Sequence, residues 1–244
     1  MDDHLDFAAT TGAVFPGATT PGEFVRSTTT LLSKHGFAPA NAIAGVAVCR
    51  DEIAAPIVAD IEATWGRSFS LAGLAGLTTA GQTGFAAAAN HSPVVDGRRR
   101  LVTCGFAHIG IARDGTMGEV SRPGVPHPSS ACGALVAFHG ELIDGTASPE
   151  FDPLNVEQSL LRQRLLPLID EMNVPPLLDL TRLAADAIEE DLLAAITGLV
   201  DAEPEPLDAA LITGIQIHGP GGIELVWPRA GHIVTATGVE TLAL

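Results

Sequence analysis

Cys49 stands at the end of an apolar run and is followed at once by charged residues. The run covers residues 42–48, and Arg50, Asp51 and Glu52 come directly after the cysteine. A buried strand that delivers a thiolate and then a carboxylate can build a metal site, because both groups are metal ligands. On an extended chain Asp51 faces the same side as Cys49, so it is a candidate metal ligand or acceptor for metal-bound water. Its alternative role is the N-cap of the next helix.

The other candidate ligands come from two further cysteines, Cys104 and Cys132, and eight histidines. Cys104 and His108 share one predicted strand, where four residues at roughly 3.3 Å each separate them by about 13 Å, too far for one ion. His108 is nearer the carboxyl end, where α/β sheets place their sites. Cys132 begins a predicted helix, whose dipole favours a thiolate. Cys49, His108 and Cys132 thus form a candidate Cys2His zinc set; the alternative is core cysteines and a hydrogen-bonded core histidine.

Alternating helix and strand patterns must position these residues. Thr20 and Glu23 form a capping box with Pro21 at the first helical position, and Gly36 follows the last turn, which predicts a helix over 21–34. The patterns further predict buried strands over 42–49 and 101–111, and helices over 51–65, 131–139, 154–171 and 178–198. Strand segments follow at 209–218, 222–228 and 232–237, with a Gly-Pro-Gly-Gly hairpin signal between the first two.

These elements predict one α/β domain over residues 1–244, with a mostly parallel central sheet flanked by helices. The zinc-site core covers about 40–140, and a helical and strand elaboration covers about 150–244. With 46% hydrophobic residues in a chain of 244, a substantial core is expected.

The charge and the cysteine content limit the partners and the compartment. A net charge of −16 argues against nucleic acid and anionic membrane surfaces as partners. No apolar run reaches the roughly 18 residues that cross a bilayer. Residues 1–4 are acidic, unlike a signal peptide, and three cysteines are an odd number without disulfide-framework spacing. We therefore expect a cytoplasmic protein.

Four motifs follow one another between about residues 40 and 140. They are Cys49-Arg50-Asp51-Glu52, then Gly81-Gln82-Thr83-Gly84-Phe85 through His91-Ser92-Pro93, then Phe106-Ala107-His108-Ile109-Gly110-Ile111, and finally Arg122-Pro123-Gly124 to Ser130-Ala131-Cys132-Gly133-Ala134-Leu135. In this order they resemble the limiting-CO2-inducible protein B (LCIB) family, whose active members are theta-class carbonic anhydrases. The family is similar in fold to β-class carbonic anhydrases.

The resemblance implies a zinc-dependent carbonic anhydrase, a lyase that hydrates carbon dioxide reversibly to bicarbonate by zinc-bound hydroxide. It implies Cys49, His108 and Cys132 as the zinc ligands, in an active site near the interface of a homodimer. It also implies an Asp and Arg pair that gates the metal, with Asp51 as the aspartate. The β-class pattern Cys-x-Asp-x-Arg would put the arginine at Ile53.

Two arginines are therefore open candidates, Arg50 and Arg122, of which Arg50 faces away from Asp51 if the strand continues regularly. Gln82, His91 and His127 are candidates for lining the pocket or transferring protons, since histidine titrates near neutrality. Each of the three also suits ordinary helix-end or loop hydrogen bonding.

Two other functions stay open. Some members of the family are regarded as inactive, so the chain could be a zinc-stabilised bicarbonate sensor or interaction protein. A thiol oxidoreductase is disfavoured because the chain has no Cys-x-x-Cys motif.

Overall fold

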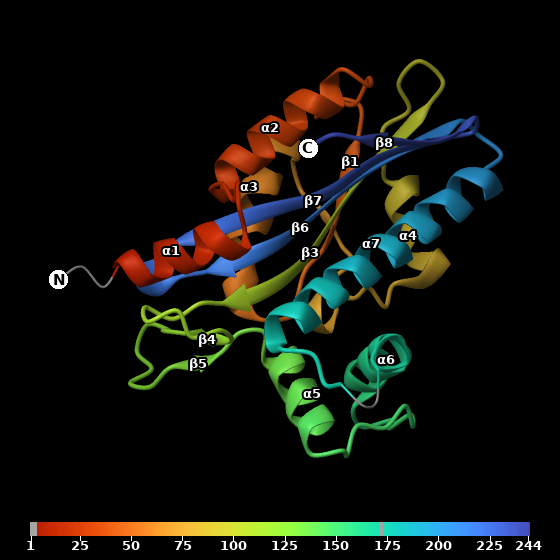
Figure 1. Ribbon diagram of the computed structural model, residues 1–244. Helices are drawn as coiled ribbons and strands as arrows, with labels where there is room; N and C mark the ends of the chain where they lie inside the picture. Colours follow the sequence, from red (N-terminus) through yellow and green to blue (C-terminus); the bar gives the residue numbers. More distant parts are fainter. Residues whose placement is uncertain (1–3, 171–172) are drawn as a thin grey trace.

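A six-stranded sheet forms the centre of the computed structural model, which describes residues 4–170 and 173–244. The strand order is β2-β1-β3-β6-β7-β8, and the strands from β1 to β8 of this sheet are labelled in Figure 1. The bounds are β1 Ile43–Ala47, β2 Phe69–Ser70, β3 Arg99–Gly110, β6 Leu207–His218, β7 Glu224–Thr235 and β8 Gly238–Leu242. Strands β2, β1, β3 and β6 run parallel, and β7 and β8 continue the sheet antiparallel. The predicted mostly parallel α/β sheet is confirmed. Residues 1–3, which entered the compartment prediction, lie outside the described part.

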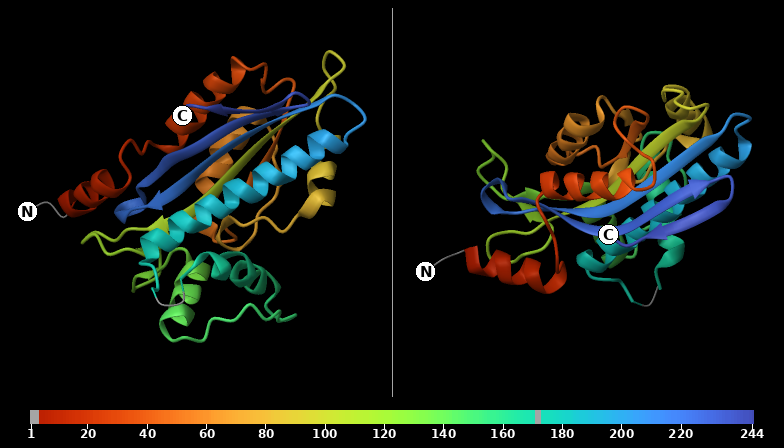
Figure 2. Two further views of the ribbon diagram at one scale, coloured as in Figure 1. Left: turned by 45° about the vertical axis from the view of Figure 1, so that its right-hand side comes forward. Right: turned by 90° about the horizontal axis from the view of Figure 1, so that it is seen from above.

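Helices cover both faces of this sheet. Their bounds are α1 His4–Val14, α2 Pro21–Ser33, α3 Ala55–Trp65, α4 Gly81–Asn90, α5 Gly133–Ile143, α6 Val156–Leu165 and α7 Leu177–Ala202. The long α7 crosses one face, while α2 and α3 lie on the other (Figure 2). None of the described helices combines the length and apolarity that a membrane crossing requires.

Strand β3 separates two hydrophobic clusters. Leu101 and Ile109 pack with the residues of α7, whereas Val102 and Phe106 pack with those of α2 and α3. This alternation follows from the period of two along a strand. Because helices cover both faces, the strand reads as a continuous apolar run rather than an alternating one.

Most element predictions agree with the structure, but the helix predicted over 154–171 is too long and the last two strand segments are wrong. Helix α6 ends at Leu165, a 3-10 turn follows at Leu166–Leu168, and residue 171 lies outside the described part. Thr20 caps α2 with the predicted capping box, and the hairpin between β6 and β7 lies at the predicted glycines. The two segments predicted at 222–228 and 232–237 are wrong as separate strands, because β7 runs through both, and β8 was not expected. Pro228 lies inside β7 where the β6–β7 register shifts by a bulge. A proline is tolerated there because a bulge leaves a residue outside the ladder of hydrogen bonds.

The carboxyl ends of β1, β3 and β6 meet at one edge of the sheet, where short strands β4 (Glu119–Val120) and β5 (Ser129–Ser130) and helix α5 also lie (Figure 1). Gly110 at the end of β3 permits this approach, since a Cβ there would stand 2.5 Å from the carbonyl oxygen of Glu119. The Gly110 N–H donates to the Ala131 carbonyl at 2.8 Å. The chain just before α5 is thereby tied to the end of β3.

Candidate metal centre

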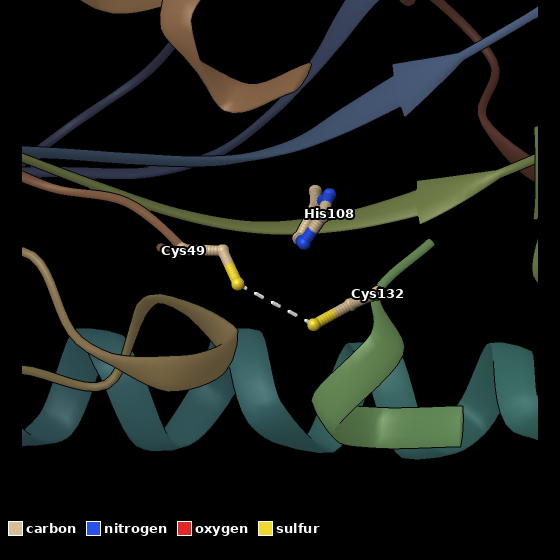
Figure 3. A group of neighbouring side chains, drawn as sticks. All are labelled: Cys49, His108 and Cys132. Carbon is tan, nitrogen blue, oxygen red and sulfur yellow. Dashed lines mark hydrogen bonds between the residues drawn. The ribbon is translucent and has the colours of Figure 1, made fainter. Parts of the chain in front are cut away.

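Cys49, His108 and Cys132 come together at this edge. Their ligand atoms all lie within 4.8 Å of one another, and the Sγ atoms of Cys49 and Cys132 are 3.6 Å apart. All three side chains are buried, and a ring nitrogen of His108 faces the two sulfurs (Figure 3). The predicted trio is the one group of at least three such side chains found close enough within the described residues.

Three different elements deliver these donors. Cys49 follows the last residue of β1 by two positions, His108 lies two positions before the end of β3, and Cys132 is the N-cap of α5. Parallel neighbours place their carboxyl ends side by side, so β1 and β3 bring the first two together. Cys104 lies in the cluster under α2 and α3, where burial raises the pKa of its thiol to about 12. It takes no part in the site, as its spacing from His108 predicted.

The donor set fits zinc. Two sulfurs bound tetrahedrally to one zinc at about 2.3 Å are roughly 3.8 Å apart, close to the separation seen between Cys49 and Cys132. The Nε2 atom of His108 is buried and has no hydrogen-bond partner among the described residues. Buried polar atoms are rarely left without a partner, and a metal ion would provide one here. Three protein donors would leave a fourth coordination position open.

The thiols of Cys49 and Cys132 differ in acidity. A hydrogen bond from Cys132 lowers the pKa of Cys49 against the opposing effect of burial, and His108 lowers it further. The neighbouring Cys49 sulfur and then burial raise the pKa of Cys132 well above its ordinary value. The pair therefore loses a first proton easily, and a bound cation would favour the loss of the second.

Asp51 is held by Arg122. Nη2 of Arg122 donates to Oδ1 and Oδ2 of Asp51 at 2.7 and 2.8 Å, and its Nε donates to Glu52 Oε1 at 2.7 Å. The other end of the guanidinium, Nη1, donates to the Ser130 carbonyl at 3.0 Å and to the Ser129 hydroxyl. Burial alone would raise the pKa of Asp51, but the hydrogen bonds, first among them those of Arg122, lower it overall. Asp51 is thus kept as an anion.

Asp51 also caps the 3-10 helix η1 (Glu52–Ala54), where its Oδ1 accepts from the Ile53 N–H at 3.4 Å. The sequence left an N-cap and a site residue as alternatives for this aspartate. The structure combines the N-cap with a pairing to Arg122.

Arg50 has a different partner. Its Nε and Nη2 donate to the carboxylate of Glu157 on α6, at distances of 3.1 and 2.6 Å to Oε1. The structure therefore separates the two arginines that the sequence left open, and pairs Asp51 with Arg122.

A wide hollow of about 550 Å³ opens beside the cluster. Its lining combines charged, polar and apolar groups: Cys49, Arg50, Asp51, Glu52, Leu74, Arg122, Ser129, Ser130, Gly133 and Ala134. Cys49 of the candidate cluster and the Asp51–Arg122 pair therefore border a space that a small molecule can enter from solvent.

Gln82, His91 and His127 lie outside this lining. Gln82 is exposed in the first turn of α4, and His91 is exposed at the end of that helix, where Nδ1 is 2.6 Å from the Ala87 carbonyl oxygen. His127 is exposed in the segment between β4 and β5 that also carries Arg122. Their proposed parts in the pocket or in proton transfer stay predictions.

Two residues next to His108, His218 and Glu224, were not among the candidates that the sequence patterns indicated. Nδ1 of His108 is 3.0 Å from Nε2 of His218, and Nδ1 of His218 is 2.7 Å from Oε2 of Glu224. His218 ends the segment predicted as a strand over 209–218, and the carboxyl-edge rule that selected His108 would have selected it too.

Known proteins share this fold. The model of the family described as limiting CO2-inducible proteins B/C β-carbonic anhydrases matches residues 18–235. The crystal structure of PtLCIB4, a homolog of the limiting CO2-inducible protein LCIB, has a TM-score of 0.83 at 25% identity, with 96% of this chain and 98% of that chain covered. The crystal structure of LCIB gives a TM-score of 0.76 at 30% identity, with coverage of 95% and 96%. No curated protein sequence matches the chain. The family match and the shared fold place the chain in the limiting CO2-inducible B/C family of β-carbonic-anhydrase type.

Proposed function

We propose that this protein is a zinc-dependent carbonic anhydrase that interconverts carbon dioxide and bicarbonate. The observation that carries the proposal is the buried Cys49-His108-Cys132 cluster, in which Cys49 borders an open hollow that the paired carboxylate Asp51 also lines. Catalytic zinc sites have three protein ligands and an open position, which this donor set would leave. Bound zinc would supply Lewis acidity and would lower the pKa of a water molecule at that position.

Asp51 has the properties of an orienting acceptor. As an anion it only accepts hydrogen bonds, and Arg122 fixes both of its oxygens. A water molecule that donates a hydrogen to this carboxylate would keep its oxygen lone pairs pointing away from Asp51, where they would be free to attack the carbon of carbon dioxide. Arg122 also restrains the carboxylate from turning toward the three ligands.

The hollow suits a small, uncharged substrate. Leu74 and Ala134 give it apolar walls, and carbon dioxide needs no charged partner to enter. Hydration releases a proton as well as bicarbonate, and the exposed His91 and His127 are our candidates for its transfer to buffer. Gln82 stays the third candidate of this group.

Stopped-flow hydration of carbon dioxide, with zinc content measured on the same samples, tests the proposal. Wild type should carry one zinc per chain and be active. Cys132→Ala should lose more than about 100-fold in zinc affinity, since removal of a ligand costs more than the 10- to 100-fold of a supporting residue. Cys104→Ala, which changes a buried cysteine outside the cluster, should keep both zinc and activity.

Equal zinc content and activity in wild type and Cys132→Ala would refute the assigned site. Full zinc loading without any hydration would instead support the inactive sensor or interaction protein. A zinc-free wild type would remove both functions.

We also propose a cytoplasmic homodimer whose partners are carbon dioxide and bicarbonate. The free state of Cys49, Cys104 and Cys132 supports a reducing compartment. Exposed apolar side chains around α5 and α6, among them Ile143 and Leu154, support association with another copy.

A further inference from the structure

The ring of His108 is oriented by a second histidine from the neighbouring strand. His218 is the last residue of β6, and its ring lies 5.1 Å from that of His108, nearly perpendicular to it. Both side chains are almost completely buried, so water does not compete for the 3.0 Å contact between them. This contact occupies Nδ1 of His108 and leaves Nε2 facing the sulfurs.

A carboxylate stands behind the second histidine. Glu224 begins β7 directly opposite His218 in the β6–β7 pairing, and its Oε2 is 2.7 Å from His218 Nδ1. The tight turn at Pro220–Gly222 fixes this register, since the two residues close the hairpin. The pair is therefore built into the sheet.

The carboxylate determines where each proton lies. An ionised Glu224 only accepts, so Nδ1 of His218 carries the hydrogen that it donates. In neutral His218 the Nε2 atom is then the acceptor, and Nδ1–H of His108 donates to it. Nε2 of His108 is left with a free lone pair, the form that binds a metal ion. If His218 instead donated from Nε2 to Nδ1 of His108, the hydrogen of neutral His108 would lie on its Nε2 atom and prevent ligation there.

We propose that His218 and Glu224 are positioning residues for the metal site, which hold His108 in the orientation and tautomer that ligate through Nε2. The inference rests on the proposed zinc site and adds a supporting pair to it. Supporting partners of this kind raise metal affinity by about 10- to 100-fold.

Zinc affinity measured by competition with a chelator tests the proposal without any use of activity. Glu224→Ala and His218→Leu should each weaken zinc binding by about 10- to 100-fold. His218→Gln should restore much of the loss, since its side-chain oxygen can accept from His108 Nδ1–H. Glu189→Ala is the matched control, because it removes the carboxylate from another partly buried His–Glu contact, His232 Nε2 of β7 to Glu189 Oε1 of α7 at 2.9 Å. It should leave zinc affinity unchanged.

The tautomer can be read in the unmodified protein. Long-range ¹H–¹⁵N NMR of the zinc-loaded wild type should show the hydrogen of His108 on Nδ1 and the metal on Nε2. A metal on Nδ1 would overturn the proposal, even if the His218 variants fail to fold.

A failure of the proposed zinc site and a failure of the positioning role of His218 and Glu224 give different results. If Cys49→Ala abolishes zinc binding while the His218 and Glu224 variants bind as tightly as wild type, the zinc site stands and this inference is wrong. If wild type binds no zinc, the proposed function is wrong and the inference falls with it.

Discussion

Arg122 is the residue that joins the most parts of the candidate site. Its guanidinium contacts Asp51 and Glu52 on one side and Ser129 and Ser130 on the other. It is only 16% exposed and Asp51 12%, whereas the Arg50 side chain is 53% exposed. Ion pairs shielded from water are stronger than exposed ones. We therefore expect Arg122, and not Arg50, to control the orientation of the Asp51 carboxylate.

Arg122→Ala should lower the kcat/KM of carbon dioxide hydration by about 10- to 100-fold, while zinc stays bound. The variant removes charge-assisted hydrogen bonds worth about 1.5–3 kcal/mol each, and 1.4 kcal/mol is tenfold in rate. Asp51 is then free to turn, including toward the open ligand position. Stopped-flow assays with zinc analysis measure the effect.

Arg50→Ala is the control, because Arg50 lines the same hollow without touching Asp51. It should change kcat/KM several-fold less than Arg122→Ala does. If both substitutions lower kcat/KM equally, the hydrogen bonds between Arg122 and Asp51 have no special part in the reaction.

Strand geometry predicts some residues of the candidate site from the sequence and leaves others open. The spacing of Cys104 from His108 and the carboxyl-edge rule selected Cys49 and His108, and the predicted helix start added Cys132. The choice between Arg50 and Arg122 could not follow, since it depends on how the irregular segment between β4 and β5 folds over the strand ends. Asp51 is paired as well as being an N-cap because that segment brings Arg122 within hydrogen-bond distance of it.

At the scale of elements, α6 is attached to the site by one carboxylate. Glu157, in its first turn, accepts from Arg50 and also from the Leu74 N–H of the 3-10 helix η2 (Leu74–Gly76) at 3.0 Å. Arg50 is near the start of the zinc-site core, and Leu74 borders the hollow. A residue of the C-terminal part thus ties two walls of the hollow together.

Glu157→Gln should lower the free energy of unfolding by about 1 kcal/mol at pH 7, a hydrogen-bond value reduced for partial exposure. Arg50 is the main cause that lowers the pKa of Glu157 below its ordinary 4.5 in the folded state. The stabilisation is therefore complete above that value and is lost as the pH falls toward the folded pKa. Denaturant unfolding of wild type and variant at pH 7 and at successively lower pH measures the difference.

Glu150→Gln provides the comparison, because Glu150 is an exposed carboxylate shortly before α6. Glu150→Gln should change the free energy of unfolding little, both at pH 7 and at lower pH. A Glu157→Gln difference that stays constant through the acid range would contradict the assigned cause.

The whole molecule shows which strands sequence patterns predict and which they miss. Strands β1, β3 and β6 are covered on both faces, so their apolar runs identified them. Edge strand β8 has four exposed residues and one buried residue, too little apolar pattern to recognise. Strands from the zinc-site core and from the C-terminal part pair directly in one sheet, through β3 and β6. The single-domain organisation stays a prediction that agrees with this pairing.

The net charge of −16 should govern how copies of the protein associate. Two copies repel at low ionic strength, and salt shortens the Debye length from about 30 Å at 0.01 M to about 3 Å at 1 M. If exposed apolar side chains such as Phe151, Leu154 and Val156 form the contact, salt removes repulsion without weakening attraction. The dimer dissociation constant should then fall with added salt, which sedimentation velocity over a range of protein concentrations measures. A dissociation constant that rises with salt would indicate an interface held by ion pairs, and a monomer under all conditions would contradict the dimer itself.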